Sequence, residues 1–171
     1  MTTTWKLDDH ESLTLHSCTT DRLDMVAEFG AGGHEPPAHW HPAQDEYFEV
    51  LDGTIAVRLD GRDLELKAGD TLRIPAGAVH QMWNPHDEAA HVRWQVTPSG
   101  RTAQWFRSID ALHRRGQVRA SGRPGLLAYA VLLTEFRDVF RPVVPAAPLV
   151  RVLLAALAPI GRMRGYRAET D

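Results

Sequence analysis

The chain has 171 residues, of which 43% are hydrophobic and 24% are charged, and its formal net charge is −3. This length predicts one domain, or one domain with an appendage. A chain of this size can bury most of its apolar surface without disulfides or a structural metal, so we expect any bound metal to serve function. The slightly acidic charge gives no reason to expect nucleic acid as a partner.

The N-terminal residues lack the basic start and apolar run of a secretory signal. The longest apolar stretches, near 126–133 and 149–160, are too short for a membrane span. We therefore expect a cytoplasmic protein. The one cysteine, Cys18, excludes an internal disulfide and is expected to be a buried thiol within a strand.

From about residue 13 to residue 98 the apolar residues are mostly spaced by two, and glycine and proline separate short runs. This pattern predicts an all-β sandwich or barrel. Asp-Gly pairs at 52–53 and 60–61 are typical of tight turns between antiparallel strands. The expected strands are 12–18, 24–29, 46–51, 54–59, 63–66, 71–74, 79–83 and 91–97.

After residue 100 the apolar spacing becomes that of a helix. Three helices are expected, around 105–112, over 126–140 before Pro142, and over 149–157 ending near Pro159 or Gly161, with a loop at 119–124. The sequence thus divides into a β-barrel with N-terminal strands (1–98) and a helical extension (99–171).

The second expected helix is apolar on more than one face and must bury against the barrel, another helix or a second subunit. The extension therefore has two interpretations. It caps the open end of the barrel, or it is an interaction surface. Exposed barrel edges and this apolar helix together predict a homodimer.

Histidines and one carboxylate form the chemically most informative pattern. His39 and His41 flank Trp40 in an extended stretch, so both imidazoles point to one face. Glu46 begins the next strand, on the same face as Phe48, and His80 opens the strand near residue 80. Three imidazoles and a carboxylate are a donor set that a divalent first-row metal accepts.

Two motifs extend this pattern. Residues 33–53 read G-x5-H-x-H-x4-E-x6-G, and residues 69–84 read G-x5-P-x-G-x2-H-x3-N. Both resemble the two signatures of the cupin superfamily, at all ten positions. The matching residues are Gly33, His39, His41, Glu46, Gly53, Gly69, Pro75, Gly77, His80 and Asn84.

This resemblance implies a double-stranded β-helix barrel over roughly residues 13–98. It implies one divalent transition metal bound by His39, His41, Glu46 and His80, with Fe or Mn favoured and Zn, Ni or Cu as alternatives. It does not imply one reaction, because cupins include dioxygenases, isomerases, decarboxylases, polyketide cyclases, sugar-binding modules and storage proteins.

Our leading functional hypothesis is a small-molecule oxygenase in which the metal is a Lewis acid or redox centre and Glu46 is a ligand or a base. The alternatives are a non-redox isomerase or polyketide-cyclase-like enzyme, and a non-catalytic cupin that binds or senses a small ligand. Arg93 and Gln95 alternate with apolar residues along one strand, so one of the two sets faces the barrel interior. The candidate pocket residues are His34, Phe48, Asn84, Arg93 and Gln95.

Overall fold

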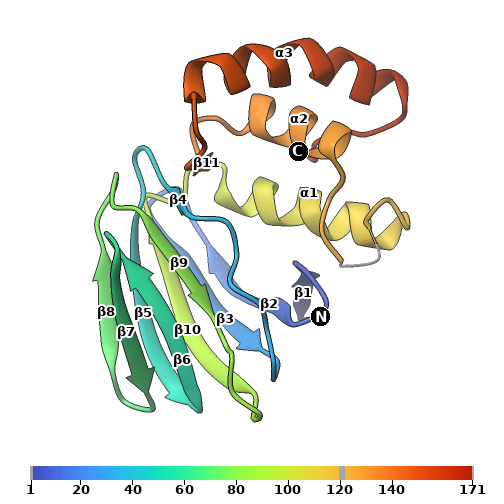
Figure 1. Cartoon of the computed structure of the whole chain (residues 1–171). Coiled ribbons are helices and arrows are strands. Elements are labelled where there is room, and N and C mark those ends of the chain that lie inside the picture. Colours follow the sequence, from blue (N-terminus) through green and yellow to red (C-terminus); the bar gives the residue numbers. More distant parts are fainter. Residues whose placement is uncertain (1, 120–121, 171) are drawn as a thin grey trace.

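The computed structural model describes residues 2–119 and 122–170. Two antiparallel sheets face each other, and three helices gather at one end of them (Figure 1). One sheet contains, in order across it, β1 (Thr3–Lys6), β2 (Glu11–Cys18), β3 (Leu23–Phe29), β10 (Ala90–Thr97), β5 (Asp45–Asp52) and β8 (Thr71–Ile74). The other contains β11 (Arg141–Pro142), β4 (His39–Trp40), β9 (His80–Trp83), β6 (Thr54–Leu59) and β7 (Arg62–Lys67). The predicted antiparallel β-barrel is confirmed.

Strand alternation builds the barrel core. In β10, Val92, Trp94 and Val96 are buried, and they alternate with more exposed residues. In the neighbouring β5, Phe48 and Val50 are buried in the same way. Each large apolar side chain removed from water contributes about 1.5–3 kcal/mol. The register of these strands is therefore held by the core, since a slip of one residue would turn every such side chain outward.

The turn between β5 and β6 needs a glycine. Gly53 has a φ of +75°, and a Cβ there would lie 2.7 Å from atoms of Ala89 and Ala90. Both the backbone conformation and the close approach exclude a side chain. This turn carries the chain from one sheet to the other, so the glycine of the first motif has a structural role.

The helices are α1 (Thr102–Arg114), α2 (Leu126–Glu135) and α3 (Ala147–Met163). The expected second helix, 126–140, was too long: α2 ends at Glu135, with Phe136 as its C-cap, and the chain continues into β11, which pairs with β4. The expected third helix was too short, because α3 continues through Pro159. Within the expected loop at 119–124, residues 120 and 121 lie outside the described residues.

Two further differences concern short strands and the cysteine. The structure adds β1, β4 and β11, which are too short or too polar to show a period in the sequence. Cys18 is exposed, so the expectation of a buried thiol was wrong. The pairing of β2 with β3 is irregular between Leu15 and Ser17, and the last three residues of β2 are exposed.

The outer face of α3 carries exposed apolar side chains, among them Leu149, Val152 and Met163. The homodimer and the use of the extension as an interaction surface stay predictions. No helix within residues 2–119 and 122–170 is long and apolar enough to cross a membrane.

Candidate metal centre

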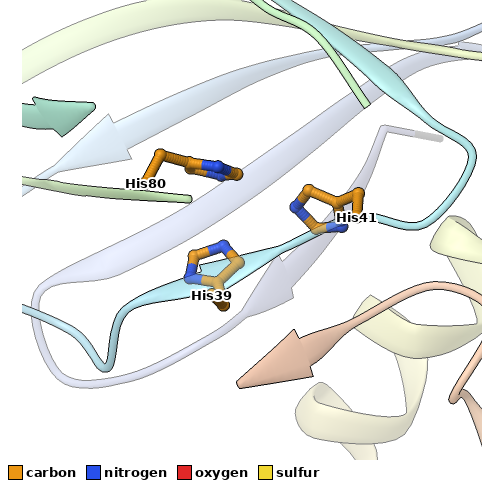
Figure 2. A group of neighbouring side chains, drawn as sticks. All are labelled: His39, His41 and His80. Atoms are coloured by element: carbon orange, nitrogen blue, oxygen red, sulfur yellow. The ribbon is translucent and has the colours of Figure 1, made fainter. Parts of the chain in front are cut away.

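Three histidines converge inside the barrel (Figure 2). His39 in β4 lies directly opposite His80 in β9, and His41 follows two residues after His39. One ring nitrogen from each histidine lies within 4.8 Å of the other two. Sequence spacing predicted that the first two would share a face, and the pairing of β4 with β9 adds the third. These atoms are close enough to bind one metal ion.

The second nitrogen of each ring is held by the backbone. Each Nδ1 lies within hydrogen-bond distance of a carbonyl oxygen, and because a carbonyl only accepts, Nδ1 carries the proton. The acceptors for His39, His41 and His80 are the carbonyls of Pro37, Val139 and Ala78, at 3.0, 2.6 and 3.1 Å. In the neutral ring each Nε2 therefore keeps its lone pair, which is the arrangement of metal-binding histidines.

Glu46 is fully buried next to two of the three histidines. Its Oε2 lies 3.0 Å from Nε2 of His80, and its Oε1 lies 3.4 Å from Nε2 of His41. Trp94 Nε1 donates to Oε1 at 3.1 Å, which fixes the orientation of the carboxylate. Glu46 is not part of the mutually close group that the three histidines form.

Two buried atoms at this point have no hydrogen-bond partner among the described residues. They are Nε2 of His41 and Oε2 of Glu46. Buried polar atoms are nearly always satisfied, and the exceptions call for a functional reason or a missing ion. A metal ion between the imidazoles would bind Nε2 of His41. Oε2 of Glu46 lies next to these imidazoles, 3.0 Å from Nε2 of His80. The donor set therefore fits a divalent metal.

The electrostatics of the centre favour a cation. Burial lowers the pKa of His39 to about 3, with the neighbouring His80 and His41 adding to the effect. Burial alone would raise the pKa of Glu46, but the surrounding imidazoles outweigh it and lower the pKa to about 2. Burial opposes the charge of His80 as well, but the Glu46 carboxylate outweighs it and raises the pKa of His80. An ionised carboxylate and a neutral His39 are the forms that bind a metal.

The three histidines line a cavity of about 140 Å³. Most of its wall is apolar and aromatic, and it comes from both the barrel and the helical extension. The barrel contributes Phe29, Phe48, Met82 and Trp94, and the extension contributes Trp105, Phe106, Ile109 and Phe140. Few of these wall side chains form hydrogen bonds, so a bound ligand would make polar contacts with only a small number of residues.

The segment after α2 packs against the histidines of this cavity. The ring of Phe140 stacks on His39, with centroids 4.5 Å apart, and on Trp105 at 4.7 Å. The preceding carbonyl, of Val139, is the acceptor that orients His41. Sequence reasoning missed both residues, because they lie about 100 positions from His39 and His41 and belong to neither motif.

Two of the five candidate pocket residues lie on the wrong face of their strand. The Arg93 guanidinium and the Gln95 amide both bond to Asp24, at 2.9 and 3.0 Å, and neither residue lines the cavity. Alternation places them opposite the buried Trp94. The expectation that they form a polar pocket is therefore corrected.

Of the other three candidates, only Phe48 lines the cavity. Asn84 is buried and structural, since its Nδ2 donates to the carbonyls of Phe29 and Glu88 at 2.9 and 2.7 Å. His34 is exposed and does not line the cavity. The cavity instead contains Glu11, a residue that sequence reasoning overlooked although it starts the alternation of a strand.

Residues 25–96 match the protein-family model described as "Cupin domain". Among the curated proteins, the chain is 29% identical over 68 residues to the tetracenomycin polyketide synthase protein TcmJ of Streptomyces glaucescens, covering 40% of this chain and 46% of the relative. It is 34% identical over 91 residues to the oxidoreductase macE of Penicillium terrestre, covering 52% and 35%. It is 30% identical over 71 residues to quercetin 2,3-dioxygenase of Bacillus subtilis, covering 42% and 21%.

The chain spans less than half the length of these curated relatives. Among solved structures, an RmlC-like cupin from Shewanella frigidimarina aligns with a TM-score of 0.53 and 17% sequence identity. The alignment covers 60% of this chain and 89% of that one. At this identity the similarity shows the fold alone.

Proposed function

Because residues 25–96 belong to the cupin superfamily, we propose that this protein is a metal-dependent enzyme that acts on a small oxygenated molecule, as an oxygenase. The observation that carries the proposal is the histidine triad, whose three Nε2 lone pairs face a cavity with apolar walls. Glu46 is proposed as the fourth ligand. The metal is proposed to be divalent iron or manganese, with zinc, nickel and copper as alternatives.

When bound, the metal supplies a Lewis acid and, if it is iron or manganese, a redox centre. The chain supplies orientation. Trp94 holds the Glu46 carboxylate through its indole N–H, and the Val139 carbonyl holds the His41 ring. Aromatic walls exclude water and present flat surfaces to a flat substrate, for which an enol, a catechol or a keto acid is proposed.

Glu46 is also proposed as the base of the reaction. Its Oε2 has no hydrogen-bond partner among the described residues and lies beside the cavity-lining His80. The neighbouring imidazoles keep this carboxylate ionised at neutral pH, which leaves it free to accept a proton but makes it a weak base. The proposed proton donor is therefore a substrate hydroxyl made more acidic by the bound metal. The Glu46 oxygen bonded to Trp94 would keep the carboxylate in place during this transfer.

The relatives support redox chemistry in part, since one is named a quercetin dioxygenase and another an oxidoreductase. A second candidate function is a non-redox isomerase or polyketide-cyclase-like enzyme. The similarity to a polyketide synthase protein favours it. Such an enzyme needs the electrophilic metal and the base but no change of oxidation state.

Oxygen uptake by the Fe(II)-loaded full chain tests the proposal. With a panel of catechols, enols and keto acids, we expect uptake that stops when Zn(II) replaces Fe(II). Equal turnover of a substrate with both metals would favour the non-redox enzyme. Tight metal and ligand binding without any turnover would identify a binding or sensory cupin and contradict the proposed enzyme.

A further inference from the structure

A carboxyl group occupies an inward-facing position of β2. Glu11 pairs with Phe29 of β3, and directly paired residues in an antiparallel sheet project to the same face. Phe29 is buried and lines the cavity. Two residues further along β2, on the same face as Glu11, Leu13 is fully buried. The strand therefore directs the Glu11 side chain into the barrel, where an apolar residue is the usual choice.

The Glu11 carboxyl makes no hydrogen bond or ion pair within the part of the chain that the structure describes, although its backbone is well held. Its carbonyl accepts from the N–H groups of Leu7 and Asp8, at 2.9 and 3.3 Å. The side chain lines the same cavity as the histidines but lies outside the metal-binding triad. The carboxyl enters a mostly apolar cavity without a partner among the described residues, so it is available to a ligand bound there.

The surroundings of Glu11 favour its neutral form. Burial raises the pKa of its carboxyl to about 8, and the nearby Asp8 carboxylate adds to the rise. At neutral pH the group is mostly protonated, so it can donate a hydrogen bond as well as accept one. The other charged or titratable groups lining the cavity are Asp8, Arg123, Tyr129 and the three histidines.

The cavity limits what the ligand can be. An apolar cavity of about 150 Å³ accommodates a benzene ring, and this one measures about 140 Å³. Its walls include the rings of Phe29, Phe48 and Phe106, which pack well against a flat apolar body. Because the histidines and Glu11 line this one small cavity, a single ring bound here has both kinds of group around it.

We propose that Glu11 is a substrate-binding residue. Its carboxyl donates a hydrogen bond to a substrate oxygen, on the part of the substrate ring that does not face the histidines. The substrate class is then a single-ring catechol or enol with a further oxygen beyond its chelating pair. This inference rests on the proposed function, since it takes the metal as the other anchor of the substrate. Glu11 thereby selects among substrates of one shape, because a site built for a hydrogen bond disfavours ligands without the matching group.

Two probes of nearly equal shape test this selection. One is 3,4-dihydroxyacetophenone, whose carbonyl accepts a hydrogen bond, and the other is 4-ethylcatechol, which lacks that carbonyl. Their affinities are measured calorimetrically on the zinc-loaded full chain, which avoids oxidation of the probes. The acetyl group also makes the catechol more acidic, so the quantity compared is the ratio of the two affinities in each variant. We expect this ratio to favour the acetophenone about tenfold more in the unaltered protein than in Glu11→Leu, as one hydrogen bond predicts. Glu11→Gln, which still donates, should keep the ratio of the unaltered protein.

The matched control is Glu28→Gln. Glu28 precedes Phe29 in β3, pairs with Ser12 and is exposed on the outer face of the sheet. It should leave the preference unchanged. Glu11→Ala is a second deletion in case the leucine variant fails to fold, and zinc affinity is measured for every variant.

An equal preference in the unaltered protein and in the Glu11 deletions would overturn the inference while leaving the metal site intact. Absence of zinc binding, or of binding by both probes, would instead contradict the proposed function, and the inference would fail with it. The same probes therefore separate the two failures.

Discussion

The cavity has two walls of different origin. The barrel wall carries the three candidate metal-binding histidines, and Glu46 lies next to His80 and His41. The wall from the helical extension contributes mainly rings, the side chains of Arg123 and Tyr129, and the carbonyl that orients His41. The candidate metal ligands thus belong to the barrel, whereas the extension supplies most of the aromatic wall on the other side and the orientation of His41. Changes in the two walls should therefore have different effects.

The largest effect is expected from the barrel wall. His80→Ala removes one of three imidazoles and leaves the Glu46 carboxylate without its closest neighbour. Loss of a supporting contact alone typically lowers metal affinity 10- to 100-fold, so loss of a ligand should lower it by at least about 100-fold. Competition with a zinc chelator measures this. His91→Ala, at a partly exposed histidine bonded to Asp52, is the control, and equal affinities of the two variants would refute the assigned centre.

Changing the extension wall should cost stability more than metal affinity. Phe140→Ala removes the ring that stacks on His39 and Trp105. Because this side chain is only partly buried, we expect a loss of about 2 kcal/mol in the free energy of unfolding, below the range for a fully buried phenylalanine. Urea unfolding measures it, and zinc affinity should fall only severalfold.

Leu149→Ala is the matched control for this change. Leu149 is 70% exposed on α3, so its truncation should alter stability by less than about 0.5 kcal/mol. If Phe140→Ala abolished metal binding as completely as His80→Ala, the division of roles between the two walls would be wrong.

The smallest expected effect is a pH dependence at Glu11, which lies on the barrel wall but near groups of the extension. Its pKa is about 8 in the folded protein, against an ordinary value of 4.5. Between these values the folded state binds more protons than the unfolded state, so the free energy of unfolding falls as pH rises from about 4.5 to 8.

Glu11→Gln removes this contribution. Between pH 5 and pH 8 we expect the variant to gain about 1–2 kcal/mol relative to the unaltered protein, less than the full shift predicts because Glu11 is partly exposed. Urea unfolding at several pH values checks this. A difference independent of pH would mean that Glu11 ionises normally.

Much of the barrel could be predicted from local pattern. Apolar residues at every second position predicted eight of the strands, and the Asp-Gly pairs predicted two turns. The helical extension was harder to predict, because the residue at which α2 ends depends on pairing with a strand that is distant in the sequence. The segment after Phe136 leaves the helix and pairs with β4, roughly a hundred residues earlier in the chain, and no local signal reports such pairing.

The sequence by itself determined which residues form the candidate metal centre, because His39, His41 and Glu46 follow the short-range geometry of strands and His80 follows a turn of recognisable spacing. Tertiary structure decided what surrounds them. The closure by Phe140, the bond from His41 to Val139 and the entry of Glu11 into the same cavity join segments far apart in the chain. Strand periodicity acts over a few residues, whereas a cavity wall forms only where distant segments pack together.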